Sequence, residues 1–228
     1  MKSYKNKILI QNTITYALVI AAFLLIQILM AGGHINSLLK GILVPLCTYV
    51  ILAVSLNLTV GILGELSLGH AGFMCVGAFS GAFFTHVMAA SIPNPQLRFI
   101  IALFVGAVVA AAFGILIGIP VLRLKGDYLA IVTLAFGEII KNVINVLYVG
   151  TDASGIHIST KDVASLNLAK GGKVIIKGAQ GITGTPKMAT FTIGFILVLI
   201  TLFIVLNMIN SRTGRAIMAI RDNRIAAE

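Results

Sequence analysis

Five long stretches of this chain contain no Asp, Glu, Lys or Arg, and each is long enough to cross the hydrocarbon of a lipid bilayer. A helix rises 1.5 Å per residue, so about 20 consecutive apolar residues make one crossing. The apolar parts of these stretches predict membrane-spanning helices at 10–31, 41–63, 71–90, 99–122 and 188–210. We therefore predict an all-α, polytopic integral membrane protein, because helices that are apolar on every side belong in a membrane.

A sixth predicted span, 128–149, has the required length but contains Glu138 and Lys141. The composition agrees with about six spans in one transmembrane domain over 1–228, since 58% of the residues are hydrophobic and only 11% are charged. Charged residues make up about a quarter of a typical soluble domain. The first apolar run follows three lysines, as in a signal peptide, but it is longer than the apolar core of a leader. We interpret it as a span, with removal as a leader as the alternative.

The distribution of Lys and Arg predicts that both termini face the cytoplasm (N-in, C-in). In that orientation the inner segments 1–7, 123–127 and 211–228 are dense in basic residues. Segment 150–187 becomes the outer loop. It holds five lysines, but a long loop constrains orientation less than a short one. Its β-like run at 174–176 predicts a small hairpin or cap. The net charge of +10 thus reflects topology, and we expect no nucleic-acid partner.

The glycine-rich run 57–81 carries Glu65 and His70. Its glycines allow a break in a helix or a close approach of two backbones, and both are frequent where a membrane protein builds a solute path. Small residues four positions apart, at Gly77/Gly81, Ala110/Gly114 and Gly114/Gly118, predict close helix packing. If the second span begins at its outer end, Glu65 and His70 lie at the inner mouth. A solvated turn would explain them there as well as a role in the solute path.

Glu138 and Lys141 are three residues apart, so they share one face of a helix and can form an ion pair. A helix that starts at Asp127 places Glu138 near the middle of the bilayer, where an unpaired carboxylate is costly. Two interpretations remain open: a polar pathway that includes Thr133, or a structural ion pair that faces neighbouring helices. The candidate residues for the solute pathway are Thr133, Glu138, Glu65 and His70.

Motifs for bound nucleotides, metals and covalent catalysis are absent from the sequence. It contains no GxxxxGK(S/T) phosphate loop, no HExxH, no Cys/His zinc set and no GxSxG elbow. We therefore predict no catalytic residue, no metal site and no cofactor in this chain. Its polar residues suit a conduit for a solute better than an enzyme.

Three blocks occur in the order typical of one transporter family. The first lies at 57–78 and includes LSLGHAGF at 66–73, the second is YLAIVTLAFGEII at 128–140, and the third is GRAIMAIRDNRIAAE at 214–228. In these blocks the chain resembles the permease subunits of bacterial ABC importers for branched-chain amino acids, the LivM-like half of the permease pair. The resemblance implies a multi-pass protein of the bacterial cell membrane that moves these amino acids into the cell.

The same resemblance implies several partners besides the lipid bilayer. They are a second, LivH-like permease subunit, two cytoplasmic ATP-binding subunits that hydrolyse the ATP, and an extracytoplasmic solute-binding protein. The third block resembles the cytoplasmic loop that ABC permeases dock into a cleft of the ATPase. By this resemblance, the residues expected to dock on the ATPase are Gly214, Arg215, Arg221, Asp222, Arg224, Ala226, Ala227 and Glu228. Taken alone, a basic segment after the last span is also typical of a positive-inside anchor.

The chain departs from the family at two places. After the polar span the family usually has a glycine-rich turn, whereas this chain reads TDASGI at 151–156, which implies that its solute preference can differ. The family also continues beyond the docking loop, so we expect 211–228 to be an incomplete docking segment of a truncated chain. The alternative functions are a permease for urea or short amides, an ion-coupled carrier or channel that uses Glu138 and Lys141, and a membrane scaffold without transport.

Overall fold

A computed structural model describes residues 2–121, 123–124, 126–152, 154–169, 171–182, 184–185 and 188–222 of the chain. The chain forms two compact units: Met1–Gly64 with Ala189–Glu228, called unit 1, and Glu65–Met188, called unit 2. Unit 1 contains α1 (Lys2–Ala31), α2 (Ser37–Asn57), the π-helix η1 (Leu58–Leu63), α6 (Phe191–Asn210) and α7 (Arg212–Asp222). Unit 2 contains α3 (His70–Val87), α4 (Pro95–Val121), α5 (Asp127–Asn145), β1 (Tyr148–Asp152), β2 (Gly155–Ser159), β3 (Lys173–Lys177) and the short 3₁₀ turns η2 (Ala164–Leu166) and η3 (Gly178–Gln180).

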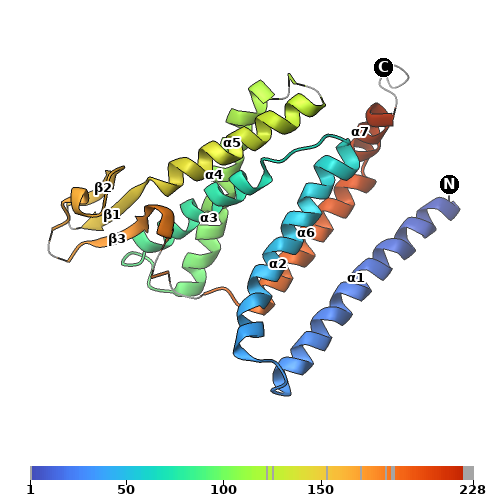
Figure 1. Ribbon diagram of the computed structural model, residues 1–228. Helices are drawn as coiled ribbons and strands as arrows, with labels where there is room; N and C mark the ends of the chain where they lie inside the picture. Colours follow the sequence, from blue (N-terminus) through green and yellow to red (C-terminus); the bar gives the residue numbers. More distant parts are fainter. Residues whose placement is uncertain are drawn as a thin grey trace. The chain divides into compact units, whose positions relative to one another are not determined.

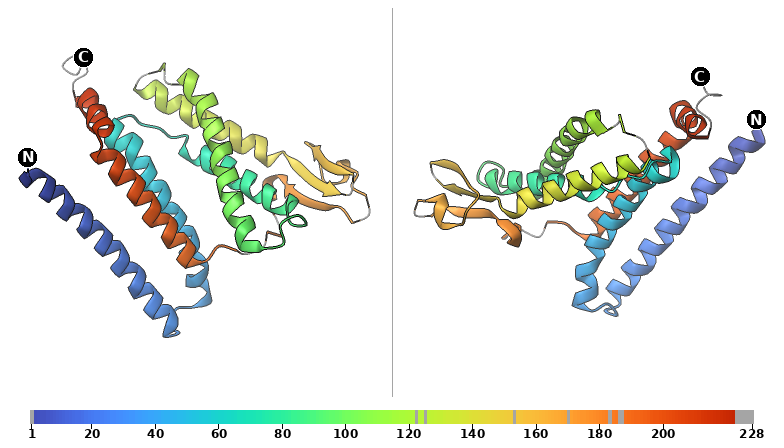
Figure 2. Two further views of the ribbon diagram at one scale, coloured as in Figure 1. Left: turned by 180° about the vertical axis from the view of Figure 1, so that it is seen from behind. Right: turned by 45° about the horizontal axis from the view of Figure 1, so that its top comes forward.

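Unit 1 is a small bundle in which α2 and α6 lie side by side and run in the same direction, with α1 antiparallel to both (Figures 1 and 2). Its core forms where Cys47 of α2 meets Val198 of α6. Gly194 permits this approach, because a methyl group at that position would lie 3.0 Å from Cβ of Cys47. The first helix contributes Phe23, whose ring stacks on that of Phe195 with the centroids 3.9 Å apart. A glycine contact and an aromatic contact thus join the three helices.

The N-terminal end of α1, the C-terminal end of η1 and the whole of α7 lie at the same end of unit 1 (Figure 1). The predicted N-in, C-in topology requires this arrangement, because α1 leads away from that end and both α2 and α6 lead back to it. Which side of a membrane that end faces stays a prediction.

Unit 2 combines α3, α4 and α5 with a three-stranded antiparallel sheet whose strand order is β2-β1-β3. Small residues let α3 pack closely against α4. A methyl group at Gly106 would lie 2.6 Å from the carbonyl oxygen of Gly77, and one at Gly81 would lie 3.0 Å from that of Ala102. The close helix packing predicted from Gly77 and Gly81 is therefore confirmed. Gly114 and Gly118 show no such contact among the described residues, because a methyl group at either position would meet nothing within 4 Å outside its own helix backbone.

The sheet contains most of the regular secondary structure described in the predicted outer loop 150–187. Its core is formed by Ile175 and Ile176, on which Phe79 of α3 packs. The β-like run predicted at 174–176 is confirmed as the centre of β3. The all-α prediction needs correction here, because β1 pairs with both β2 and β3. That pairing satisfies backbone N–H and C=O groups that a loop of irregular structure would leave to water.

Four helical segments among the described residues are long and apolar enough to cross a membrane, namely Leu9–Ala31, Ser37–Leu63, Pro95–Val121 and Phe191–Asn210. They match four of the predicted spans. The predicted spans 71–90 and 128–149 correspond to α3 and α5, which have 18 and 19 residues and are not among the four. α5 is shorter than expected because the chain enters β1 soon after Asn145. The total of six spans therefore stays a prediction.

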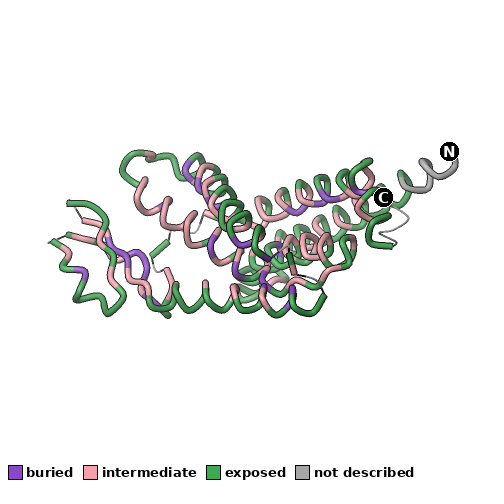
Figure 3. The backbone as a smooth tube through the Cα atoms, turned by 90° about the horizontal axis from the view of Figure 1, so that it is seen from above, coloured by how far each residue is buried: buried purple, intermediate pink, exposed green. Residues whose placement is uncertain are grey.

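Exposed residues, drawn green in Figure 3, occur along all the long helices. Many of them are large and apolar, on α5 as well as on α1, α2, α4 and α6, the four helices that contain the membrane-span candidates. Contiguous exposed apolar surface marks contact with lipid or with other proteins. This burial pattern is that of a membrane protein whose helices face lipid or further subunits.

Asp152 anchors the turn between β1 and β2. Its Oδ1 atom accepts hydrogen bonds from the backbone N–H groups of Ser154 (2.8 Å) and Gly155 (3.1 Å), and its Oδ2 atom accepts one from the N–H of Ala169 (3.0 Å). Nε2 of His157 lies 3.1 Å from Oδ1, and the Asp152 side chain is only 2% exposed. The Ser154 hydroxyl, which donates to Oδ1, and the Ala169 N–H hold the pKa of this carboxyl group well below its usual range. Asp152 therefore orders this loop.

We expect Asp152→Asn to loosen the turn, because an amide nitrogen cannot accept the hydrogen bonds that a carboxylate oxygen accepts. Amide hydrogen exchange across 152–156 should become about tenfold faster or more, as local opening becomes easier. The lowered pKa belongs to the folded state, so the carboxylate stabilises the turn fully above about pH 3.9 and this effect is lost only as the pH falls through the lower folded value.

Asp162→Asn is the matched control for this measurement. Among the described residues, the Asp162 carboxylate accepts one hydrogen bond, from the Ser165 N–H at 2.8 Å. We expect this variant to leave exchange across 152–156 unchanged. Equal exchange in Asp152→Asn and in the unmodified protein would contradict the anchoring role.

Candidate functional site

The chain leaves the helix at residues 65–69, between η1 and α3, and this extended segment packs against α5. The backbone N–H of Leu68 donates a hydrogen bond to Oγ1 of Thr133, at 3.0 Å. The Thr133 hydroxyl in turn donates to the carbonyl oxygen of Ala130, also at 3.0 Å, and the residue is only 8% exposed. A hydroxyl has one donor and two acceptor sites, so Thr133 can serve its own helix and the extended segment together.

Glycine residues bring the two backbones into contact. A methyl group at Gly69 would lie 2.7 Å from the carbonyl oxygen of Thr133, and one at Gly72 would lie 3.0 Å from Cα of Gly137. The φ angle of Gly69 is −82°, which any residue adopts, so the requirement for glycine at this position is purely steric. The structure thus brings the LSLGHAGF motif at 66–73 onto the α5 helix that carries the second sequence block.

The segment 65–69, the adjoining start of α3 and the face of α5 that holds them form the candidate functional site. Non-helical backbone at membrane depth is stable only where it is buried in protein or lines a polar cavity. Transporters use such breaks to present backbone N–H and C=O groups to a solute. This site therefore offers the chemistry of backbone polar groups set among apolar helices.

The structure places the predicted pathway residues in two groups. Thr133 is buried at the site, and Glu65 and His70, both half-buried, lie at the two ends of the extended segment. Glu138 lies elsewhere on α5: five residues separate it from Thr133, which is about 140° around a helix of 3.6 residues per turn. Its carboxylate is 3.1 Å from Nζ of Lys141, and these side chains are 53% and 60% exposed. The predicted ion pair is confirmed, while the role of all four residues in a solute pathway stays a prediction.

The described part of the predicted docking segment forms α7, and much of it contacts its own chain. Gly214 is buried, its N–H donates to Oγ of Ser211 at 3.0 Å, and a methyl group there would lie 2.5 Å from the carbonyl oxygen of Ile209. Arg215 donates from Nη1 to the carbonyl oxygen of Asn210 at 2.8 Å, at the C-terminal end of α6. The remaining predicted docking residues Arg224, Ala226, Ala227 and Glu228 lie outside the described residues.

Arg221 reaches from α7 to the end of η1. Its Nη1 atom donates a hydrogen bond of 2.7 Å to the carbonyl oxygen of Gly61, and its Nη2 atom lies 2.8 Å from Oδ1 of the neighbouring Asp222. Sequence reasoning assigned both residues to ATPase docking and missed this contact, because Gly61 is 160 residues away in the chain. That assignment stays a prediction.

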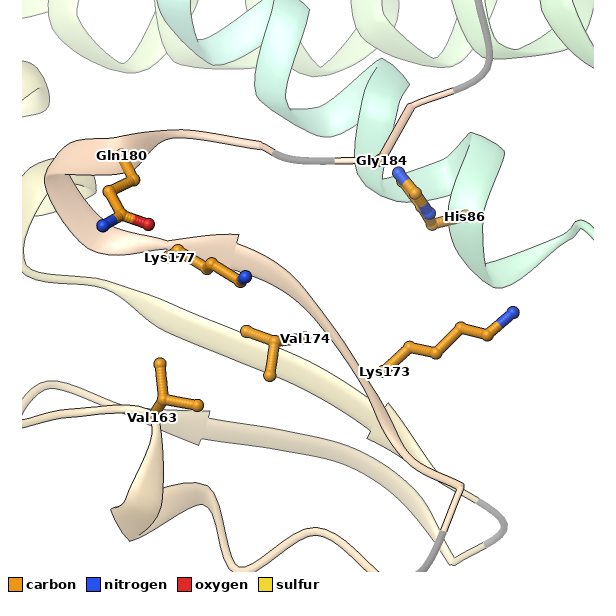
Figure 4. Close-up of a pocket in the computed structure, with 7 residues that line it drawn as sticks. All are labelled: His86, Val163, Lys173, Val174, Lys177, Gln180 and Gly184. Atoms are coloured by element: carbon orange, nitrogen blue, oxygen red, sulfur yellow. The ribbon is translucent and has the colours of Figure 1, made fainter.

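A pocket of about 550 Å³ opens between the sheet and the end of α3 (Figure 4). Its lining residues are His86, Val163, Lys173, Val174, Lys177, Gln180 and Gly184. In Figure 4 the Lys173 side chain extends on the side of the pocket where His86 lies, and Lys177 lies on the side of Gln180. The sequence analysis treated these lysines as a matter of topology and missed the pocket. The available signal was the concentration of five lysines in one loop.

The described residues contain no group of three or more His, Cys, Asp or Glu side chains placed to hold a metal ion. The arrangement at the candidate site rests on backbone groups, a threonine hydroxyl and glycine contacts.

Comparison with known proteins identifies relatives of the chain. The family whose sequence model matches residues 38–228 is described as "Branched-chain amino acid transport system / permease component". Two relatives are the "High-affinity branched-chain amino acid transport system permease protein LivM" of Escherichia coli strain K12 and that of Salmonella typhimurium strain LT2. Each is 34% identical over 187 residues, which cover 78% of this chain and 42% of the relative, so the chain spans less than half the length of these relatives. No solved structure matches the chain.

We expect Gly69→Ala to separate segment 65–69 from α5, because the added methyl group meets backbone, which cannot rotate away. Overpacking of this kind costs about 1–3 kcal/mol, so the thermal unfolding midpoint in detergent should fall by several degrees. Gly114→Ala is the matched control, since the methyl group it adds to α4 meets no described atom within 4 Å outside its own helix backbone. Equal midpoints for the two variants would contradict the close contact.

Thr133→Val should destabilise the same junction, because valine has nearly the same shape but leaves the Leu68 N–H without its acceptor. The expected loss is about 0.5–1.5 kcal/mol, the net contribution of one hydrogen bond. Thr133→Ser keeps the hydroxyl and is expected to retain most of the stability. Chemical unfolding in mixed micelles measures both variants, and a larger loss for Thr133→Ser than for Thr133→Val would show that the methyl group matters more than the hydrogen bond.

Proposed function

Because this chain belongs to the family of permease components of branched-chain amino acid transport systems, we propose that it is a membrane-spanning subunit of an ABC importer for branched-chain amino acids. In this proposal the chain lies in the bacterial cell membrane, and separate cytoplasmic subunits hydrolyse ATP. The chain itself supplies a path for the solute and a connection to the ATPase.

The contact of segment 65–69 with Thr133 is the observation that carries the proposal. A branched-chain amino acid has an ammonium group, a carboxylate and an apolar side chain. Backbone carbonyl and N–H groups of a broken helix can bind the two charged ends, and the surrounding apolar helices suit the side chain. A site built in this way needs no charged protein side chain, in agreement with the position of Glu138 away from Thr133.

Two further features support the proposed partners. The basic helix α7 follows directly on α6, as a docking helix at the cytoplasmic end of the last described span would. In the N-in orientation the pocket with His86, Lys173 and Lys177 faces the extracytoplasmic side, where its positive charge suits acidic groups of a solute-binding protein. The proposed complex also contains a second, LivH-like permease subunit and two ATP-binding subunits.

The test is uptake by the native complex in proteoliposomes that contain the ATPase subunits and the solute-binding protein. We expect labelled leucine, isoleucine or valine to enter only when ATP hydrolysis occurs, and dissipation of ion gradients to have no effect. Glu138→Gln should leave the requirement for ATP unchanged, because ATP provides the energy in this proposal.

Other outcomes identify the alternatives. Uptake that follows an ion gradient without ATP and is abolished in Glu138→Gln would show an ion-coupled carrier that uses Glu138 and Lys141. Competition by urea or acetamide but not by leucine would show a permease for short amides. A chain that binds ATPase subunits but transports none of these solutes would leave only a scaffold role.

A further inference from the structure

The C-terminal end of α2 and η1 needs partners for its last carbonyl groups. A helix leaves its final C=O groups without partners inside the helix, and a cation near this end is favourable because it opposes the helix dipole. η1 ends at Leu63, and the next residue, Gly64, has a φ of +78° that turns the chain out of the helix. Arg221 supplies a donor at this end through the 2.7 Å hydrogen bond from Nη1 to the carbonyl oxygen of Gly61.

The Arg221 side chain is held in place from two directions. Its Nε and Nη2 atoms lie 3.0 and 2.8 Å from Oδ1 of Asp222, which orients the guanidinium group. Its Cγ and Cδ atoms cover Gly64, where a methyl group would lie 2.8 Å from each of them. Gly64 is therefore required twice, for its left-handed φ and for the space that Arg221 occupies.

The contact between Arg221 and Gly61 links two segments to which roles have been proposed. Gly61 lies inside the π-helix that directly precedes segment 65–69, and π-helical turns are frequent at functional sites. α7 lies inside the predicted ATPase-docking segment 211–228. Arg221 thus connects two elements. One is α7, in the segment proposed to bind the ATPase, and the other is the end of η1, which precedes the proposed solute site.

We propose that Arg221 is a positioning residue that couples α7 to the end of η1, so that displacement of α7 moves the helix break at Gly64. This inference rests on the proposed function. The guanidinium group faces its own chain, with Asp222 as the residue that orients it. Charge-assisted hydrogen bonds are among the stronger polar contacts in proteins, which suits a contact that must move two elements together.

The experiment compares Arg221→Met with Arg123→Met in the native complex with its ATPase and solute-binding subunits. Methionine keeps apolar cover over Gly64 and removes the donor. Arg123 lies between α4 and α5, outside the predicted docking segment, is exposed and donates no side-chain hydrogen bond to the described residues, so its replacement matches the loss of charge. The measurements are the amount of ATPase subunit that co-purifies and the number of solute molecules transported per ATP hydrolysed.

We expect Arg221→Met to retain its ATPase subunits within about twofold but to transport about tenfold less solute per ATP, the factor that corresponds to loss of about 1.4 kcal/mol. Arg123→Met should keep both quantities near those of the unmodified complex. Normal transport per ATP in Arg221→Met would overturn the proposal. Loss of the ATPase subunits in this variant would also overturn it, because Arg221 would then contact the ATPase directly.

Failure of the unmodified complex to bind ATPase or to transport would contradict the proposed function itself, and is distinguishable from both of these results.

A second measurement tests the contact between Arg221 and Gly64 without transport. The fall in thermal unfolding midpoint caused by Gly64→Ala should be smaller in an Arg221→Ala background, because the steric part of the cost is relieved while the strain at φ +78° remains. Strict additivity of the two substitutions would show that the side chains do not meet.

Discussion

A backbone that leaves its helix among apolar surroundings must find partners for its polar groups within the protein, and the architecture of unit 2 depends on this constraint. Segment 65–69 meets it through the hydrogen bond from the Leu68 N–H to Thr133. The hydrogen bond is possible only because Gly69 and Gly72 let the segment touch α5. The Thr133 hydroxyl and the two glycines therefore position segment 65–69, on which the proposed solute site depends.

The same constraint operates at the helix ends of unit 1. Arg215 donates to the carbonyl oxygen of Asn210 at the end of α6, and Arg221 donates to that of Gly61 in η1. Both arginines come from α7, so this short helix completes the hydrogen bonding of two long apolar helices. Arginine suits this task because its planar fork offers several donors in fixed directions. The basic residues that follow the last span thus have a structural role in addition to any effect on orientation.

Local patterns predicted those features that depend on neighbours in the sequence. The charge-free runs predicted four of the spans, and the three-residue spacing of Glu138 and Lys141 predicted their ion pair. The β-branched run at 174–176 predicted the centre of β3. For this loop the sequence predicted a small hairpin or cap but not a three-stranded sheet. The reason is that β1 also pairs with β3, which begins only at Lys173, and that Tyr148 and Val149 fell inside the predicted span 128–149. Asp152 was noted only as a departure from a glycine, whereas its hydrogen bonds give it an anchoring role.

By itself the sequence determined the membrane class, the helical spans of greatest length and the likeness to a permease family, since long apolar runs and short motifs are properties of contiguous residues. The tertiary structure decided which partners the polar residues contact. It turned Thr133 toward the backbone of segment 65–69 and separated it from Glu138, and it placed Arg221 on Gly61. These contacts join residues that lie far apart in the chain, and only packing in three dimensions determines which donor meets which acceptor.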